Sequence, residues 1–87
     1  MQLDDIFIFK SERFAVGQEL ESGKYYLSIP VSNGLVEYEE YYEITQEEFD
    51  RFSAALAEMR ELAEQSRARK LDERLIMKPG SRRGSPI

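Results

Sequence analysis

The 87-residue sequence contains no cysteine and no histidine. Without cysteine, neither a disulfide framework nor a thiolate metal site can supplement the core. Without histidine, the chain also lacks the commonest general base and the usual imidazole ligand of transition metals. No Asp-rich loop or phosphate-cradling glycine motif takes their place. These absences argue against an enzyme and against a bound metal or organic cofactor, and we expect none of these.

Long apolar runs are absent as well. The N-terminal stretch MQLDDIFIFK places two aspartates before a run of only four apolar residues, which fits neither a signal peptide nor a membrane span. Hydrophobic residues make up 41% of the chain and charged residues 33%, a composition typical of a globular protein. We expect a soluble, cytoplasmic protein with one domain over residues 1–80 and a tail over residues 81–87.

Positive charge is scarce in the first part of the chain. The net charge is −5, but residues 1–50 hold three basic against twelve acidic residues, whereas residues 51–87 hold nine basic and five acidic residues. An acidic body repels nucleic acid at long range and attracts basic proteins. The distribution therefore favours a protein partner and argues against direct binding of nucleic acid.

Period-two alternation predicts two β-hairpins. Ile6–Phe9 is a β-branched and aromatic run too short for a helix, and Arg13–Val16 is its expected partner. Asn33-Gly34 is a strong hairpin signal, and the segments on either side predict a second hairpin over Lys24–Ile44.

The register of the second hairpin follows from its apolar pattern, because a slip of one residue would reverse both faces. A two-residue loop at Asn33-Gly34 and a four-residue loop over 32–35 give the same parity. Pro30 favours the longer loop, since it then occupies a site where its missing N–H is not needed. The expected pairs are Val31 with Val36, Ile29 with Tyr38, and Tyr25 with Tyr42. The expected core face is Tyr25, Leu27, Ile29, Val31, Val36, Tyr38, Tyr42 and Ile44.

The opposite face of this hairpin concentrates negative charge. Closely spaced carboxylates repel one another, which costs stability unless cations or a partner offset it. Tyrosine adds amphipathic anchoring area and is frequent in interface hot spots. The alternative is a solvated face whose charges discourage aggregation between sheet edges. We predict that the partner-binding residues on this face are Glu37, Glu39, Glu43, Tyr26 and Tyr41.

Glu40 breaks the alternation, because it falls on the apolar face opposite Leu27 in the expected register. We expect it at the margin of the sheet with its carboxylate reaching water. A β-bulge is the alternative.

At Thr45 the hydrophobic period changes from two to nearly four. Thr45 and Glu48 form a capping-box pattern that predicts a helix start. The apolar residues that follow fall on one stripe, which predicts a long helix over Gln46–Lys70 packed on the sheet. The expected fold is α+β: an antiparallel sheet of hairpins, or meander, covered on one face by this long helix and followed by a flexible basic tail. The predicted stripe is Phe49, Phe52, Leu56, Met59, Leu62 and Ala63.

The C-terminal region is less regular. Leu75–Met77 could dock on the core as a strand or extend the helix, and Lys78-Pro79-Gly80 would end either element. Residues 81–87 are expected to be mobile. Arg82 and Arg83 favour pairing with acids of the same molecule, or disorder, over binding of phosphate.

The stretch YYLSIPVSNGLVEYEEYYEITQEEFDRF resembles small immunity proteins encoded beside toxins in bacterial contact-dependent growth-inhibition and related polymorphic toxin systems. The resemblance extends roughly over residues 25–69 and is one of general style, so no functional residue is carried over. It implies a cytosolic protein that binds its cognate toxin, often a basic nuclease, and blocks its active site or its access to substrate.

Two hypotheses of function follow. In the first, the protein is a stoichiometric inhibitor whose strand carboxylates replace nucleic-acid phosphates against a basic toxin. In the second, it is a homo-oligomeric regulatory or structural module, in which the same face or Leu75–Met77 contacts a second copy. We expect a monomer or a weak homodimer.

Overall fold

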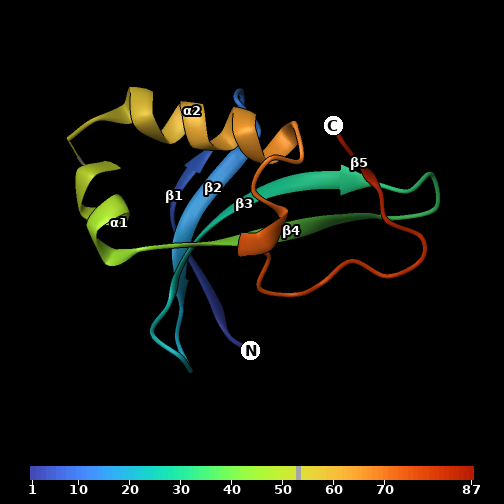
Figure 1. Cartoon of the computed structure of the whole chain (residues 1–87), viewed down its shortest axis with the longest axis horizontal. Coiled ribbons are helices and arrows are strands. Elements are labelled where there is room, and N and C mark those ends of the chain that lie inside the picture. Colours follow the sequence, from blue (N-terminus) through green and yellow to red (C-terminus); the bar gives the residue numbers. More distant parts are fainter. Residues whose placement is uncertain (53) are drawn as a thin grey trace.

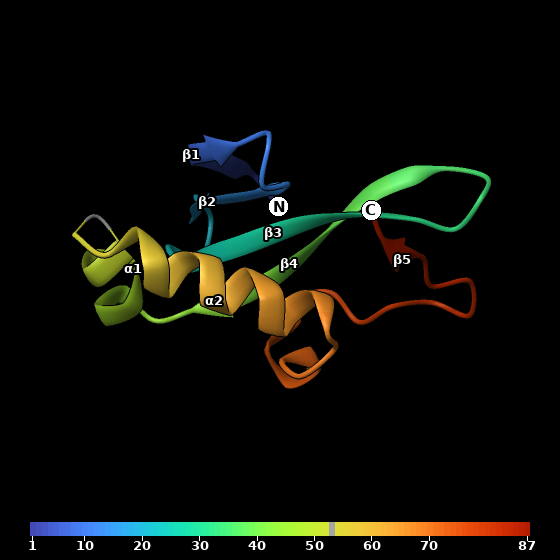
Figure 2. The same cartoon turned by 90° about the horizontal axis from the view of Figure 1, so that it is seen from above.

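The computed structural model describes residues 1–52 and 54–87. Strands β1 to β4 form an antiparallel meander in chain order, and β5 adds to β3. The two α-helices lie together on one side of the sheet (Figures 1 and 2). The α+β prediction is therefore confirmed. The elements are β1 (Leu3–Phe9), β2 (Phe14–Glu19), β3 (Tyr25–Ser32), β4 (Glu37–Ile44), α1 (Gln46–Phe52), α2 (Leu56–Arg67), the 3-10 helix η1 (Asp72–Arg74) and β5 (Ser85–Pro86).

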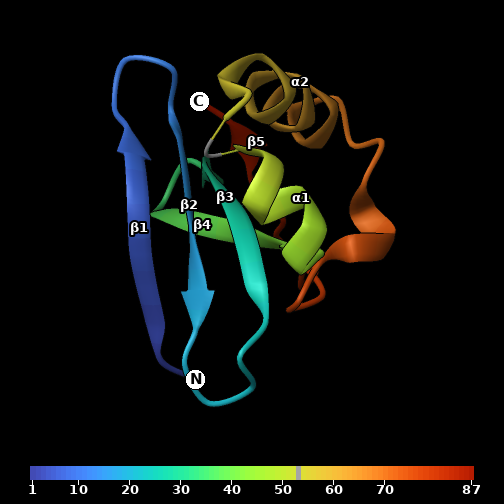
Figure 3. The same ribbon diagram turned by 90° about the vertical axis from the view of Figure 1, so that its left-hand side faces the viewer.

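The sheet is strongly coiled, so that β4, which pairs with β3, runs at a steep angle to β1 and β2 (Figures 1 and 3). β1 and β2 form the first predicted hairpin, with Phe9 opposite Phe14 at its closed end. A β-bulge lies between Asp5 and Phe7, where Ile6 is the extra residue. Bulges bend a strand and increase its local twist. Side chains are also buried on the face of the sheet away from the helices, where Tyr26 is 0% and Ser28 is 1% exposed.

The register of β3 with β4 differs by two residues from the predicted one. Val31 lies opposite Tyr38 and not opposite Val36. The reason is the Asn33 side chain, whose Oδ1 accepts the N–H groups of Leu35 at 2.9 Å and Val36 at 3.0 Å. This Asx-type turn draws Val36 into the loop, where it is exposed. A two-residue shift preserves parity, so the remaining residues keep their predicted faces.

Pro30 occupies the kind of site that the longer loop was predicted to provide. Asn33 N–H donates to Val36 O at 3.2 Å, so hydrogen-bonded pairs alternate along the hairpin from that point. Pro30, opposite Glu39, therefore falls at a non-hydrogen-bonded position with respect to β4. Its carbonyl instead accepts the Ile87 N–H at 3.2 Å on the other edge of β3.

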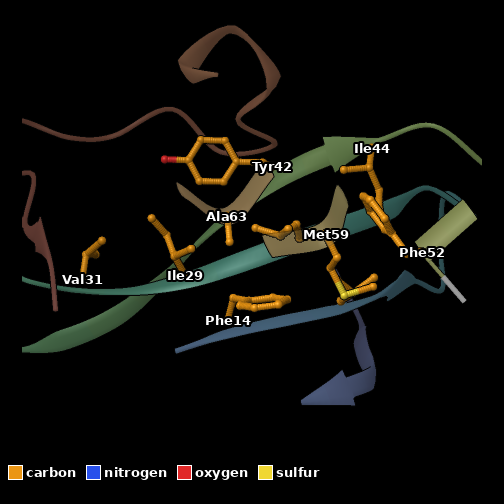
Figure 4. Close-up of a cluster of buried hydrophobic side chains, with 10 residues drawn as sticks. Phe14, Ile29, Val31, Tyr42, Ile44, Phe52, Met59 and Ala63 are labelled. Atoms are coloured by element: carbon orange, nitrogen blue, oxygen red, sulfur yellow. The ribbon is translucent and has the colours of Figure 1, made fainter. Parts of the chain in front are cut away.

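The hydrophobic core lies between the helices and the sheet (Figure 4). Aromatic pairs extend it, with Tyr25 of β3 stacked on Phe49 of α1 at a centroid distance of 4.1 Å and Phe9 of β1 stacked on Phe14 of β2 at 4.7 Å. Stacked aromatic pairs bury large apolar areas in a fixed geometry. The buried members of the core are Phe14, Val16, Leu27, Ile29, Val31, Tyr42, Ile44, Phe52, Met59 and Ala63.

Two helices replace the single long helix predicted over Gln46–Lys70. The capping box is present, since Thr45 Oγ1 accepts Glu48 N–H at 3.0 Å and Glu48 Oε1 accepts Thr45 N–H at 2.9 Å. α1 ends at Phe52 and α2 begins at Leu56, so the prediction of one continuous helix is wrong. The interruption lets each short helix follow the coiled sheet, which a straight helix about 37 Å long would overhang.

The C-terminal end of α2 has a hydrogen-bond pattern that redirects the chain. Arg69 N–H donates to Ser66 O at 3.1 Å and Lys70 N–H donates to Gln65 O at 3.0 Å, which is a Schellman motif. The left-handed position of this motif, usually glycine, is Arg69 with φ of 62°. The turn aims the guanidinium of Arg69 back toward β4.

The segment predicted as a flexible tail is instead part of the fold. Before this tail, the Leu75–Met77 segment, predicted to dock as a strand or to extend the helix, docks beside β4. Leu75 forms an isolated β-bridge with Tyr42, and Ile76 N–H donates to Tyr41 O at 2.8 Å. Further along, Ser85–Pro86 pairs with the end of β3. Gly84 is buried, and a β-carbon at this position would lie 2.6 Å from the Ser32 carbonyl carbon. The close approach of two backbones therefore requires glycine here.

An ion-pair cluster, which we call the Glu40 latch, holds this segment. Glu40 is only 5% exposed, and Arg69 Nη1 contacts it at 2.5 Å and Arg83 Nε at 2.8 Å. Arg83 Nη1 also pairs with Asp72 at 2.6 Å. Burial raises the pKa of Glu40, but the hydrogen bonds and charges of the two arginines outweigh it, so the pKa is lowered. The expectation of a water-exposed Glu40 at the sheet margin is wrong. Arg69, which follows α2, and Arg83, near the C-terminus, both contact its carboxylate and leave it 5% exposed.

Replacement of Met59 by alanine tests the packing of α2. Met59 is 1% exposed in the centre of the core, so Met59→Ala is expected to destabilise the fold by about 2–5 kcal/mol in urea unfolding. The control Glu61→Ala, at an exposed position of the same helix, should change stability by less than about 0.5 kcal/mol. Equal effects of the two substitutions would contradict the observed packing.

Adjacent arginines provide a matched test of the Glu40 latch. Arg83→Ala is expected to cost roughly 1–3 kcal/mol, less than the about 3–5 kcal/mol of an unpaired buried charge because Arg69 still contacts Glu40. The exposed neighbour Arg82 makes no ion pair within the described residues, so Arg82→Ala should change stability by less than about 0.5 kcal/mol. Hydrogen exchange at Gly84 and Ile87 should speed up in Arg83→Ala alone; unchanged exchange would show that the latch does not hold β5.

Candidate functional site

The candidate site lies on the face of the sheet that points away from the helices. The register places Tyr26 opposite Glu43, Ser28 opposite Tyr41, and Pro30 opposite Glu39. β2 and β1 extend this face, with Gly17 next to Tyr26 and Asp5 next to Gly17. The coiled sheet therefore brings Asp5, from the start of the chain, toward the acidic strand β4.

Tyr26 is not available to a partner, which corrects the prediction that it is a contact residue. Its side chain is 0% exposed, and its hydroxyl donates to Asp5 Oδ1 at 2.5 Å. The absence of a side chain at Gly17 makes room for it, since a β-carbon there would lie 2.5 Å from the Tyr26 hydroxyl oxygen. Burial and the hydrogen bond to Asp5 raise the pKa of Tyr26. Tyr26 is therefore a buried packing residue of this face, which contacts Asp5 and Tyr41 but is not accessible to a partner.

Tyr41 and Glu39 are half-buried on the same face. The Tyr41 ring meets the Tyr26 ring edge-on at a centroid distance of 5.1 Å, which fixes its orientation. Burial raises the pKa of Glu39, the Ser28 hydroxyl partly opposes this by donating to it at 3.4 Å, and the charge of Asp5 raises it further. Burial and the charges of Glu39 and Asp5 also raise the pKa of Tyr41. The carboxylates of Asp5 and Glu39 are thus close enough to repel each other.

The two other predicted contact residues lie at opposite ends of this row. Glu37 is exposed where β4 begins. Glu43 is exposed near the other end of β4 and pairs with Lys24 at 3.4 Å. Because successive residues on one face of a strand are about 6.8 Å apart, Glu37 and Glu43 are separated by roughly 20 Å along β4. The structure therefore places Glu37 and Glu39 together and Glu43 apart from them.

The basic residues of the C-terminal half mostly neutralise acids elsewhere in the molecule. Arg67 donates to the backbone carbonyls of Glu12 and Arg13, so it holds the β1–β2 turn. Within the described residues, no cationic side chain lies within 4 Å of the carboxylates of Asp5, Glu37 and Glu39. The internal ion pairs include Glu12–Arg60, Glu48–Arg74, Glu58–Arg51, Glu40–Arg69, Glu40–Arg83 and Asp72–Arg83.

These three carboxylates line a cavity of about 330 Å³, which we call the acidic groove. Its apolar lining includes Ile8 from β1, Pro30 from β3 and Ile87 after β5, and Lys10 and Arg13 of the β1–β2 turn also line it. Ile8 is 60% exposed and Ile87 is 37% exposed. The acidic groove thus combines unpaired negative charge with accessible apolar walls.

Asp5 and Ile87 are among the groove residues that sequence reasoning missed. A regular strand would place Asp5 on the same face as Phe7 and Phe9, because side chains alternate. The bulge at Ile6 reverses that phase and turns Asp5 toward Tyr26. Ile87 joins the groove only through the docking of β5. Nothing in the local sequence signals either placement.

In residues 1–52 and 54–87, no three acidic, histidine or cysteine side chains are grouped so that they could hold a metal ion. None of the helices in that part of the chain has the length and apolar composition needed to cross a membrane. Comparisons with protein-family models, with curated proteins and with solved structures found no match.

Neutralising Glu39 is expected to stabilise the protein at neutral pH. Its pKa is raised in the folded state, so the folded protein binds this proton more tightly than the unfolded chain does, and stability falls as pH rises through that pKa. Glu39→Gln removes this cost while keeping an oxygen for the Ser28 hydroxyl. Its melting temperature should exceed that of the wild type at pH 7.

The gain from Glu39→Gln should vanish below about pH 4, where both the folded and the unfolded chains carry a protonated Glu39. Glu43→Gln serves as the control, because Glu43 is exposed and paired with Lys24. It should give no gain at either pH. A destabilised Glu39→Gln protein at pH 7 would show that the Glu39 charge is compensated in the fold.

Proposed function

We propose that this chain is a protein-binding module and not an enzyme, and that it acts as an immunity protein that neutralises a cognate bacterial toxin in the cytoplasm. The toxin would be a basic nuclease. The observation that carries the proposal is the charge of the acidic groove: Asp5, Glu37 and Glu39 line one cavity and form no ion pair within the described residues, whereas Glu12, Glu40 and Glu48 are each paired with an arginine.

The inhibitory mechanism would be electrostatic mimicry. A nuclease binds the phosphates of its substrate with lysines and arginines, and carboxylates on a rigid strand can occupy those positions. Complementary charge accelerates encounter and selects the partner. The half-buried Tyr41 would add a desolvated anchor beside the carboxylates. Binding would then cover the substrate site of the toxin without any chemistry.

The energetics of the groove support this role. Partial burial of Glu39 and, to a smaller extent, the charge of Asp5 disfavour the ionised form of Glu39 in the free protein and raise its pKa. Groups held in such unfavourable surroundings are frequent at functional sites. A basic partner would relieve the repulsion on binding, so part of the cost in the free protein returns as affinity.

A second function, self-association, is favoured by a different observation. β1 is an outer strand of the sheet, and its Ile6 and Ile8 are 44% and 60% exposed. An open edge with exposed apolar side chains can pair with another strand. Light scattering separates the two functions, because a homo-oligomeric module is a stable dimer at micromolar concentration whereas an inhibitor of this kind is a monomer.

The test of the proposed function is charge reversal with a matched control. Glu37→Lys combined with Glu39→Lys should weaken binding to the protein encoded by the neighbouring gene at least tenfold, or about 1.4 kcal/mol, mainly by slowing association. Wild-type affinity should fall as salt rises. Surface plasmon resonance at two salt concentrations measures both effects.

The control for this test is Glu61→Lys combined with Glu73→Lys, which makes the same change in net charge at exposed positions outside the groove. It should bind nearly as well as the wild type. Circular dichroism should show that both double variants remain folded. If the groove variant binds as tightly as the wild type, this face is only a solvated surface and the proposed function is wrong.

A further inference from the structure

We propose that the acidic groove receives one arginine side chain of the partner, with its guanidinium at the carboxylates of Asp5 and Glu39 and its methylene stem between Ile8 and Ile87. This inference rests on the proposed function and specifies the chemical group that the site recognises. Three features of the groove lead to it: its apolar walls, its paired carboxylates and the way in which one wall is held.

The apolar walls are independent of the charges and point to an elongated occupant. Ile8 on β1 and Ile87 after β5 come from opposite ends of the chain and line the same cavity as Pro30. Both isoleucines are well exposed, at 60% and 37%, so covering them would remove apolar surface from water. A small cation has no apolar group that could cover Ile8 and Ile87. A long side chain with an apolar stem and a charged end matches them.

The carboxylates favour arginine over lysine as that side chain. Asp5 already accepts the Tyr26 hydroxyl through Oδ1, and Glu39 has only the long hydrogen bond of 3.4 Å from Ser28. Both therefore retain free acceptor capacity. A guanidinium has five donors in a planar fork and can bridge two carboxylates, whereas an ammonium is a compact and more strongly hydrated point charge.

Lys10 and Arg13 limit the occupant to a single cation. Both line the same cavity as the three carboxylates. Neither forms an ion pair within the described residues, so their charges remain free to act on a ligand. Together with Asp5, Glu37 and Glu39 they leave the lining with a net charge of −1 (−3 + 2), which one bound arginine neutralises and a second cation would exceed. The groove therefore selects an isolated arginine and disfavours a continuous run of basic residues.

The Glu40 latch preforms the wall that Ile87 provides. Glu39 and Glu40 are neighbours on β4 that point to opposite faces, so the latch lies behind the groove. Through Arg83 it holds the strand whose end places the Ile87 N–H on Pro30 O at 3.2 Å. A wall that is already ordered costs little entropy when a ligand binds. The latch thereby acts as a positioning device for the groove.

Capped tripeptides give a direct test that needs no knowledge of the partner. The probes are acetyl-Gly-Arg-Gly-amide, its lysine analogue, and its citrulline analogue, which has nearly the same shape as arginine without the charge. Titration of the full-length protein is followed by ¹⁵N–¹H NMR. We expect millimolar binding of the arginine peptide, at least about tenfold tighter than citrulline and tighter than lysine, with shifts at Asp5, Ile8, Glu39 and Ile87.

Variants assign the binding to the groove. Glu39→Gln should weaken the arginine peptide about tenfold and abolish its advantage over citrulline. Ile8→Ala should weaken arginine and citrulline peptides alike, because it removes contact with the stem. Glu61→Gln, which removes an exposed charge outside the groove, should bind like the wild type. Each variant is checked for folding by its NMR spectrum before titration.

Equal shifts with arginine and citrulline, or arginine-specific shifts outside the groove, would overturn the inference. So would the absence of any arginine-specific shift at tens of millimolar peptide. The outcome is separable from that of the charge-reversal test. If the peptide fails but the Glu37/Glu39 reversal still abolishes partner binding, the proposed function stands and the single-arginine mode is wrong. If both fail, the groove is not a binding site.

Discussion

The fold depends on the buried carboxylate of Glu40 more than on any other single polar group. It lies on the helix face of β4 at 5% exposure, where a charge without partners would be costly. Arg69 and Arg83 compensate it from two different segments, and Asp72 fixes Arg83 in turn. The left-handed conformation of Arg69, where glycine is usual, carries a strain that this contact offsets. The chain after α2 is therefore folded onto the sheet by charge as well as by apolar burial.

On the other face of β4, a carboxylate is left without a paired cation in the part of the chain that the structure describes. Glu40 is neutralised by the chain itself, whereas its neighbour Glu39 is partly buried beside Asp5 and has a raised pKa. Several acidic residues of the first half of the sequence thus form ion pairs with basic residues of the second half, whereas others form no ion pair within the described residues. Part of that remainder, Asp5, Glu37 and Glu39, gathers in a groove with apolar walls. A protein that maintains such a groove at a cost in stability is expected to use it.

Local patterns were sufficient for the coarse architecture and for part of the candidate site. The alternation in β3 and β4 assigned Glu37, Glu39 and Tyr41 to the face away from the helices, because parity survives a register shift of two residues. The register itself was predicted wrongly, since the Asn33 side chain closes a wider loop than the apolar pattern indicates. The single long helix was also wrong, because periodicity reports which face is apolar but not whether the axis stays straight on a coiled sheet.

The sequence alone determined the features that depend on near neighbours: the capping box at Thr45, the two hairpins, the faces of β4 and the excess of acid in the first half. Only the tertiary structure decided the features that depend on contacts across the chain. The bulge at Ile6 reverses the phase of Asp5, the coiled sheet buries Tyr26 over Gly17, and Arg83 ties the last residues to Glu40. Each joins segments far apart in sequence, so no local pattern encodes it, and together they build the groove.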